Sequence, residues 1–196
     1  MTRSNDRWGI LTALCFLLAL HVSAQDTEPT LANTMNSIAN ALNSRGTISW
    51  TETLPEIFGA SYTVTSSLSE VNADSSACSL RWTSVYTSSD DKLVETSLVR
   101  LEIVSSAQVR SLSEYRRSQA VQKIQVSPEI YAVEMKSDAP LARHRALYHK
   151  NKLKKETNVP NDREARIAFS DEQTAKKVAD GIRQAAKSCK ELKSGP

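Results

Sequence analysis

Residues 165–189 read ARIAFSDEQTAKKVADGIRQAAKSC, and this stretch predicts how the fold closes. Apolar residues alternate from Ala165 to Phe169, which is the period of a half-buried strand. The next four residues match a capping box, in which Ser170 caps a helix and Gln173 reaches back to it. The helix then carries one stripe of small and apolar side chains: Ala175, Val178, Ala179, Ile182, Ala186 and Cys189. We expect this stripe to cover a sheet.

Upstream, the middle of the chain is rich in serine, threonine and β-branched residues, and its apolar residues alternate. The alternating sets are Ile48 and Trp50; Tyr62, Val64 and Leu68; Cys78, Leu80, Trp82 and Tyr86; Val99, Leu101 and Ile103; Tyr131, Val133 and Met135; and Ala142, Ala146 and Tyr148. Short polar turns such as residues 87–92 join these predicted strands, which indicates an antiparallel meander. Residues 105–120 favour either a loop or a short helix.

Another helix is predicted before the strands, over residues 31–43. Thr30 can cap it, and Gly46 ends it. Its apolar stripe has helical spacing and consists of Leu31, Met35, Ile38 and Leu42. The fold class is therefore predicted as α+β, with an N-terminal helix, an antiparallel meander and a C-terminal helix that caps it.

The first 24 residues have the three parts of a cleavable secretory signal peptide. The start is basic, residues 9–20 are uncharged and mostly apolar, and Val22 and Ala24 suit the −3 and −1 positions of a cleavage site. The apolar run spans about 18 Å as a helix, against roughly 30 Å of bilayer hydrocarbon, so no permanent transmembrane anchor is expected. We expect cleavage between Ala24 and Gln25 and a secreted or periplasmic location.

About 172 residues remain after cleavage, a length that suits one domain. They divide into a polar lead-in at 25–30, a single α+β domain at 31–192 and a tail at 193–196. The whole chain has 25 Lys and Arg against 22 Asp and Glu, a net charge of +3. This balance is too mild to predict binding of nucleic acid or a membrane by the chain as a whole.

The cysteines predict one disulfide. Cys15 leaves with the signal peptide, and Cys78 and Cys189 remain. A lone pair in an oxidising compartment favours a disulfide over two free thiols or a metal or catalytic pair, since neither residue lies in a Cys-x-x-Cys motif or near a histidine. Because both lie on predicted apolar faces, the bond would tie the final helix to the sheet.

The order of helix, strands and closing helix, together with Phe169-Ser-Asp-Glu-Gln-Thr-Ala175, resembles a known group. These are small exported bacterial proteins of unknown function with a pleckstrin-homology-like (PH-like) β-barrel or sandwich. Their final helix often follows a strand ending in Phe-x-Asp-x-x-x-Ala and carries a cysteine near its end. The resemblance covers most of residues 31–192, although the N-terminal helix and a basic excursion near 141–163 depart from a minimal domain. It implies a scaffold that usually binds rather than catalyses.

A basic segment runs from Leu141 to Lys155 without an acidic residue. Its cations are Arg143, Arg145, Lys150, Lys152, Lys154 and Lys155. Such a cluster can bind phosphate, sulfate or acidic polymer groups. Alternatively, it is a solvated hairpin whose charges keep an exposed edge strand from pairing with other chains. Tyr148 is the only aromatic residue within it, so stacking on single-stranded nucleic acid is not expected.

Motifs for metal binding or catalysis are weak. His144 and His149 would lie on opposite faces of a strand, with no third ligand nearby. Ser89 and Lys92 match Ser-x-x-Lys, but in a polar turn and without the companion motifs of penicillin-binding enzymes. We therefore expect no catalytic site, metal or cofactor.

We expect an exported, non-catalytic binding domain whose partner, a protein or a small ligand, lies outside the cytoplasm. The first alternative is binding of an anionic polymer or lipid headgroup through residues 143–155. The second is a hydrolase whose carboxylates meet in the fold; the candidates are Glu52, Glu56, Glu70 and Asp74. Trp50 and Trp82 can line a ligand groove, although their β period fits core positions better.

Mass spectrometry of the exported protein tests two of these expectations together. The N-terminus should lie at Gln25, and the mass should be two hydrogen atoms below that of the reduced form, because Cys78 and Cys189 are joined. A retained leader, or two free thiols in the exported protein, would contradict them.

Overall fold

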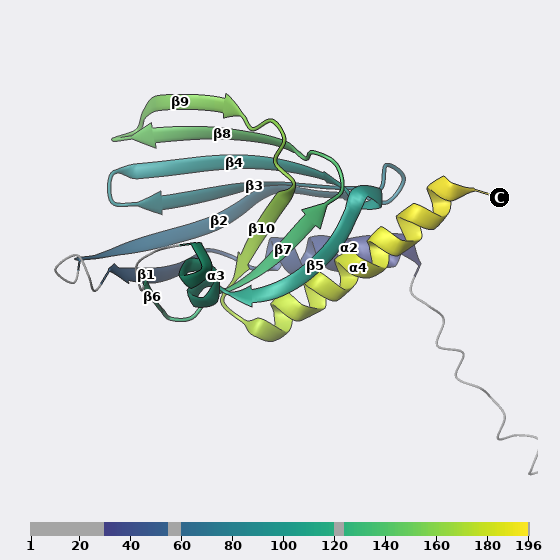
Figure 1. The fold of residues 1–196 in the computed structure, drawn as a ribbon, viewed down its shortest axis with the longest axis horizontal. Helices are drawn as coiled ribbons and strands as arrows, with labels where there is room; N and C mark the ends of the chain where they lie inside the picture. Colours follow the sequence, from purple (N-terminus) through teal and green to yellow (C-terminus); the bar gives the residue numbers. More distant parts are fainter. Residues whose placement is uncertain (1–29, 55–59, 120–123, 196) are drawn as a thin grey trace, which may run out of the picture.

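The computed structural model describes residues 30–195 except 55–59 and 120–123 (Figure 1). The predicted signal peptide and its cleavage site at Ala24 and Gln25 therefore lie outside the described residues. The helices described are α2 (Leu31–Ser44), α3 (Leu112–Gln119) and α4 (Glu172–Ser194), and η1 (Leu101–Ile103) is a single 3-10 turn. The strands are β1 (Ile48–Leu54), β2 (Ala60–Asp74), β3 (Ser79–Ser88), β4 (Asp91–Arg100), β5 (Val104–Ser111), β6 (Gln125–Ser127), β7 (Tyr131–Ser137), β8 (Ala142–His149), β9 (Lys152–Asn158) and β10 (Glu164–Phe169).

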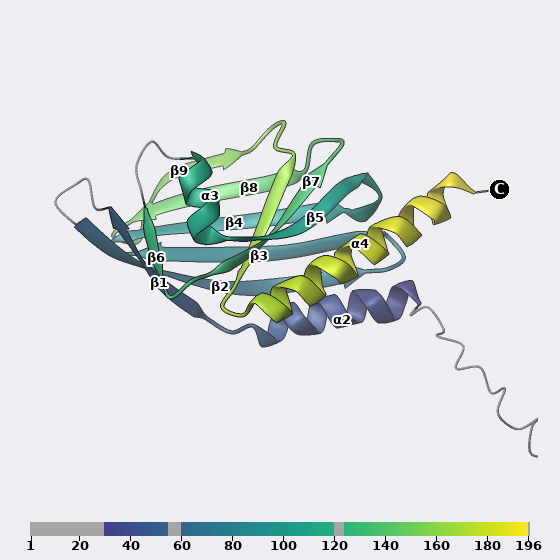
Figure 2. The same cartoon turned by 60° about the horizontal axis from the view of Figure 1, so that its bottom comes forward.

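Two antiparallel sheets with N-terminal and C-terminal helices make this an α+β fold, as predicted (Figures 1 and 2). The larger sheet has seven strands in the order β6-β1-β2-β3-β4-β8-β9, and the smaller has three in the order β10-β7-β5. Within the described residues neither sheet closes into a barrel, so the PH-like barrel stays a prediction. The smaller sheet crosses one face of the larger, and α2 and α4 lie side by side next to it (Figure 2).

The predicted meander is correct only from β1 to β4, which pair in chain order. At η1 the chain turns, and the amide of Leu101 donates to the carbonyl of Cys78 at 2.8 Å. The chain then alternates between the sheets: β5, β7 and β10 form the smaller one, and β6, β8 and β9 join the larger. Leu101 and Ile103 were expected to continue a strand and lie in this turn instead. Alternation of apolar residues marks a buried face but does not tell which sheet a strand joins.

Residues 105–120, expected as a loop or a short helix, hold most of β5 and then α3. The helix is confirmed, and the strand was missed. Val104 and Ala107 are the only buried residues of β5, so its apolar alternation is too weak to identify from sequence.

The main hydrophobic core lies between the helices and the two sheets. Every residue of the predicted α4 stripe is buried, as are Met35, Ile38 and Leu42 of α2. Trp82 is 1% exposed and belongs to this core. Gly181 lets α2 and α4 approach closely, because a Cβ at this position would lie 3.1 Å from Cγ1 of Ile38.

Of the two predicted helix caps, the one for α2 is confirmed and the one for α4 is wrong. Thr30 caps α2 as predicted, since its Oγ1 accepts from the amide of Asn33 at 3.3 Å. The predicted cap at Ser170 is wrong: α4 begins one residue later, and Oδ2 of Asp171 accepts from the amide of Thr174 at 2.6 Å. Hydrogen bonds at this helix end lower the pKa of Asp171. Helix α4 also runs to Ser194, so it takes in the first half of the predicted tail at 193–196.

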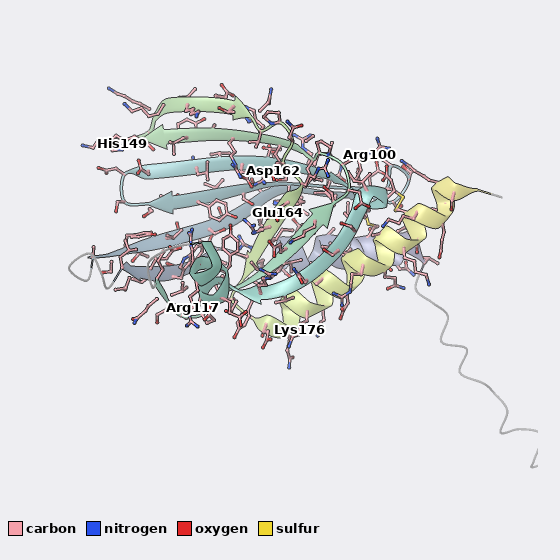
Figure 3. All side chains as sticks on the ribbon, viewed as in Figure 1. Arg100, Arg117, His149, Asp162, Glu164 and Lys176 are labelled. Carbon is pink, nitrogen blue, oxygen red and sulfur yellow. A yellow bond between two sulfur atoms is a disulfide. The ribbon has the colours of Figure 1, made fainter. Side chains whose placement is uncertain are left out.

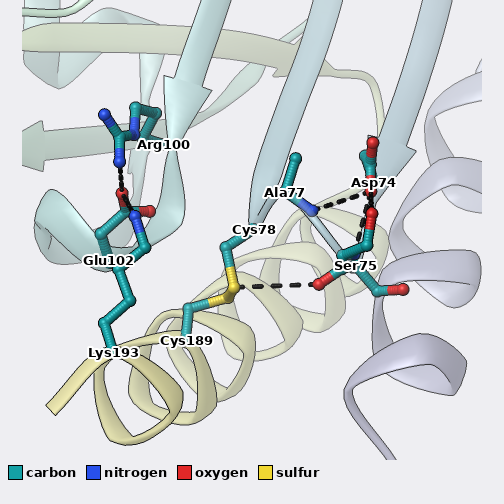
Figure 4. The surroundings of a disulfide bond; sticks show 9 residues. Asp74, Ser75, Ala77, Cys78, Arg100, Glu102, Cys189 and Lys193 are labelled. Atoms are coloured by element: carbon teal, nitrogen blue, oxygen red, sulfur yellow. Dashed lines mark hydrogen bonds and ion pairs between the residues drawn. A yellow bond between two sulfur atoms is a disulfide. The ribbon is translucent and has the colours of Figure 1, made fainter. Parts of the chain in front are cut away.

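The predicted disulfide between Cys78 and Cys189 is present (Figure 4). Cys78 lies in the turn before β3 and Cys189 in the last part of α4, with 5.8 Å between their Cα atoms. Both residues are buried, so the bond joins the helix to the sheet inside the core. None of the helices in the described part of the chain is long and apolar enough to cross a membrane.

Removing the disulfide should destabilise the protein strongly. The bond joins residues separated by 111 positions. The chain-entropy model gives about 5 kcal/mol for a loop of this length, because the cross-link restricts the unfolded chain. Urea unfolding of a Cys78→Ser/Cys189→Ser variant should show this loss in the free energy of unfolding. Equal stability of the oxidised protein and the variant would contradict it.

Candidate functional site

A cleft of about 380 Å³ lies between the larger sheet, β10 and α3. Its walls carry four arginines, which are Arg116, Arg143, Arg145 and Arg166, and three aromatic rings, which are Trp50, Tyr86 and Tyr115. Glu95 is the one carboxylate among the described lining residues. We call this site the arginine cleft.

Strand register explains why these side chains meet. Directly opposed residues on neighbouring strands share a face, and the pairs Trp50 and Val64, Ser66 and Tyr86, and Glu95 and Arg145 continue one face across the larger sheet. On β10 the apolar face of Ile167 packs in the main core. Arg166 and Ala168, of opposite parity, therefore point away from that core and line the cleft.

Arg143 connects the two sheets at one end of the cleft. From β8, its guanidinium donates to the carboxylate of Glu95 on β4 and to that of Asp162. It also donates to the carbonyl oxygen of Glu164 on β10 at 2.6 Å. Figure 3 shows Asp162 and Glu164 at the start of β10, beside β8 and β4. The Arg143 side chain is 8% exposed, so these acceptors replace almost all of its contact with water.

A buried carboxylate, Glu52, lies behind the cleft on β1. It accepts hydrogen bonds from Nε1 of Trp50 at 3.0 Å and from the hydroxyl of Tyr62 at 2.7 Å. Arg116 of α3 donates to the same carboxylate at 2.9 Å. Loss of hydration and the bond to Glu52 raise the pKa of Tyr62. Glu52 thus anchors one aromatic ring and one arginine of the cleft wall.

Two more arginines lie at β10: Arg166 lines the cleft, and Arg45 binds the backbone of β10 next to it. The guanidinium of Arg166 stacks 4.0 Å from the ring centroid of Tyr115 and donates to Glu134 at 3.1 Å. Arg45 follows α2 and donates to the carbonyl oxygen of Ala168 at 2.7 Å. Desolvation lowers the pKa of Arg45, and no carboxylate among the described residues forms a salt bridge with it.

This arrangement favours binding of an acidic group. Each of the four cleft arginines pairs with a carboxylate, which fixes its position, but an arginine has five N–H donors and these pairs use only some of them. The buried Nε atoms of Arg116, Arg143 and Arg166 have no hydrogen-bond partner among the described residues. These pairs join α3 to β1, β8 to β4 and β10 to β7, and Arg143 also links the two sheets through Asp162 and Glu164, so the arginines have a structural role with or without a ligand.

The structure divides the predicted basic segment into two parts. Arg143 and Arg145 lie in the cleft, both paired with Glu95. Lys150 lies 3.8 Å from Asp90. Lys152, Lys154 and Lys155 are exposed on β9, which is an edge strand of the larger sheet, and form no salt bridge with a described residue. Arg143 is therefore withdrawn from the surface, whereas Arg145 and Lys155 line a neighbouring pocket together. The lysines of β9 lie where a charged edge prevents pairing with another chain.

The other candidates from the sequence do not come together. Ring nitrogens of His144 and His149 lie near the carboxylates of Glu156 and Asp91, at 3.0 and 2.8 Å. Ser89 lies in the β3–β4 turn, and Lys92 lies over the ring of Tyr148 at 5.7 Å.

The carboxylates proposed for a hydrolase are also apart. Glu52 lies behind the cleft, whereas Glu70 accepts from Thr83 on the opposite face of the larger sheet. Asp74 binds the turn at Ser76 and Ala77, and Glu56 lies outside the described residues. In the parts of the chain that the structure describes, no three His, Cys, Asp or Glu side chains form a metal site.

Several cleft residues were missed from sequence. Tyr115 and Arg116 lie in the segment left open as loop or helix, and Arg166 was placed on the polar face of its strand. Trp50 was given both as a groove residue and, with preference, as core; it is 4% exposed and lines the cleft. One signal could have pointed to the cleft. Arg166 and Glu134 occupy facing positions on neighbouring strands, and such a pair of opposite charges suggests a buried polar face.

Comparison with protein-family models, curated proteins and solved structures finds no match for this chain.

Arg143→Ala should lower the free energy of unfolding by about 3 kcal/mol, because it breaks a buried ion pair and leaves the Glu164 carbonyl without its donor. The loss stays near the low end of the usual range because Arg145 still pairs with Glu95. Lys152→Ala, on the exposed edge, is the control and should stay within about 0.5 kcal/mol of the parent protein. Similar urea midpoints for both variants would contradict the structural role of Arg143.

Proposed function

We propose that this chain is an exported, non-catalytic binding domain that holds a small acidic ligand in the arginine cleft. The observation that carries the proposal is the composition of the cleft wall, with four arginines and three aromatic rings against one carboxylate. A cleft of about 380 Å³ is within the range of small-molecule sites, roughly 300–1,000 Å³. Fixed guanidinium groups bind carboxylates and phosphates with little loss of side-chain freedom.

The carboxylates near the cleft support binding over catalysis. Glu52 accepts from three donors, and Glu95 pairs with two arginines. A general base or nucleophile must reach the substrate, whereas these groups hold the wall in place. The hydrolase alternative requires two close, reactive carboxyl groups, and among the described residues its candidates lie apart.

Export and scaffold class belong to the same proposal. The leader at 1–24 and the disulfide fit an oxidising location outside the cytoplasm. The closing helix with its cysteine fits the resemblance to exported PH-like proteins, which implies a binding scaffold.

Binding of an anionic polymer or lipid headgroup through residues 143–155 has weaker support. Two of its six cations are paired with Glu95, and one of these, Arg143, is buried; the lysines of β9 suit protection of an edge strand.

Tryptophan fluorescence with 3-phenylpropionate and its neutral amide tests the proposal, since Trp50 lines the cleft. The acid should bind saturably and the amide at least about tenfold more weakly, because hydrogen bonds to a charged group are the stronger ones. Arg145→Gln, at a half-exposed position, should weaken binding of the acid; Lys154→Gln is the matched control and should not. Absence of binding by any small acid, or equal binding of the amide, would overturn the proposal.

A further inference from the structure

Among the described residues, no strand lies beside one edge of β10. β10 pairs with β7 on one side only, and its other edge borders the arginine cleft. At each end of this edge an arginine side chain donates a hydrogen bond to a backbone carbonyl oxygen. Arg143 donates to Glu164, and Arg45 donates to Ala168. These two arginines therefore frame a short stretch of strand edge that lies between them.

Arg166 is the residue between these two sites. In an antiparallel pair, the backbone groups of alternate residues point away from the partner strand. Glu164 and Ala168 direct their carbonyls away from β7, so Arg166, which has the same parity, directs its N–H and C=O to the same side. No described residue forms a hydrogen bond with these two backbone groups. An unpaired donor and acceptor on a strand edge are the groups that bind an added strand.

We infer that the ligand of the arginine cleft is the C-terminal end of a short extended peptide, bound along the free edge of β10. This inference rests on the proposed function and specifies its ligand. One peptide residue exchanges two hydrogen bonds with the backbone of Arg166, as in a single antiparallel pair. The next carbonyls on the β10 edge lie about 6.7 Å away along the strand and are occupied by arginines, so only a short segment fits.

The positions of the arginines decide the direction of the peptide. Arg143 and Arg145 lie beside the start of β10, where Arg143 binds the Glu164 carbonyl and Arg145 lies 3.8 Å from Asp162. A segment antiparallel to β10 ends at this side of the cleft. Its terminal carboxylate therefore comes to the guanidinium of Arg145, which is 41% exposed and has N–H donors available. A parallel segment would bring its N-terminus, a cation when unblocked, to the same arginines.

The remaining cleft wall specifies the last side chain. Trp50, Tyr86 and Leu93 give the larger sheet an apolar surface opposite β10. An apolar or aromatic residue at the C-terminus can pack there while its carboxylate contacts Arg145. A terminal acidic side chain would meet Glu95 in the same cleft.

Four probes test the inference: N-acetyl-Ala-Phe, the same peptide with a methylated alanine nitrogen, its C-terminal amide, and 3-phenylpropionate. The free acid should bind best. N-methylation removes the donor to the Arg166 carbonyl and the amide removes the carboxylate charge, so each should weaken binding about tenfold. In Arg145→Gln the difference between the acid and the amide should largely disappear, whereas Lys154→Gln should retain it.

Nuclear magnetic resonance of the protein gives a second readout. The backbone amide signal of Arg166 should shift on binding of N-acetyl-Ala-Phe and not with its N-methylated form. If 3-phenylpropionate and the N-methylated peptide bind as tightly as N-acetyl-Ala-Phe, the peptide inference fails while the acidic-ligand function stands. If neither the peptide nor 3-phenylpropionate binds, the proposed function itself fails.

Discussion

The arrangement of the two sheets depends on one buried guanidinium. Arg143 extends from β8 and binds the carboxylates of Glu95 and Asp162 together with the backbone of β10. A charge that has left water needs this full set of acceptors, and they come from two segments: Glu95 from β4, and Asp162 and Glu164 from the start of β10. Arg143 therefore fixes the start of β10 against β4 and β8 of the larger sheet, beside the arginine cleft.

The smaller sheet separates two environments. One of its faces packs with α2 and α4 in a core closed by the disulfide of Cys78, and the other faces the arginine cleft. The helix side supplies stability through apolar burial. On the cleft side, the arginines pair with carboxylates, and these pairs use only some of the N–H donors of each arginine. Binding groups on a rigid sheet supported from behind lose little freedom when a ligand arrives.

Local sequence patterns identified most elements and missed others. The helical stripes, the Thr30 cap and most strands follow from side-chain period and from hydrogen bonds within a few residues. The errors include η1 and β5, where the chain changes sheets, the short strand β6, the strand order beyond β4, and the cap of α4. At the cap of α4 two candidate side chains are adjacent, and a shift of one residue changes the local chemistry very little.

The sequence by itself determined the α+β class, the two amphipathic helices and the pairing of the only cysteines left after the predicted leader. Each of these follows from periodicity or from counting. Only the tertiary structure decided that the chain divides its strands between two sheets, that Arg143 and Arg145 turn inward while the lysines of the same segment stay in water, and that Arg166 meets them. The physical reason is that such contacts join residues far apart in the chain, and an arginine shows no sign in its local sequence of whether a carboxylate will meet it in the fold.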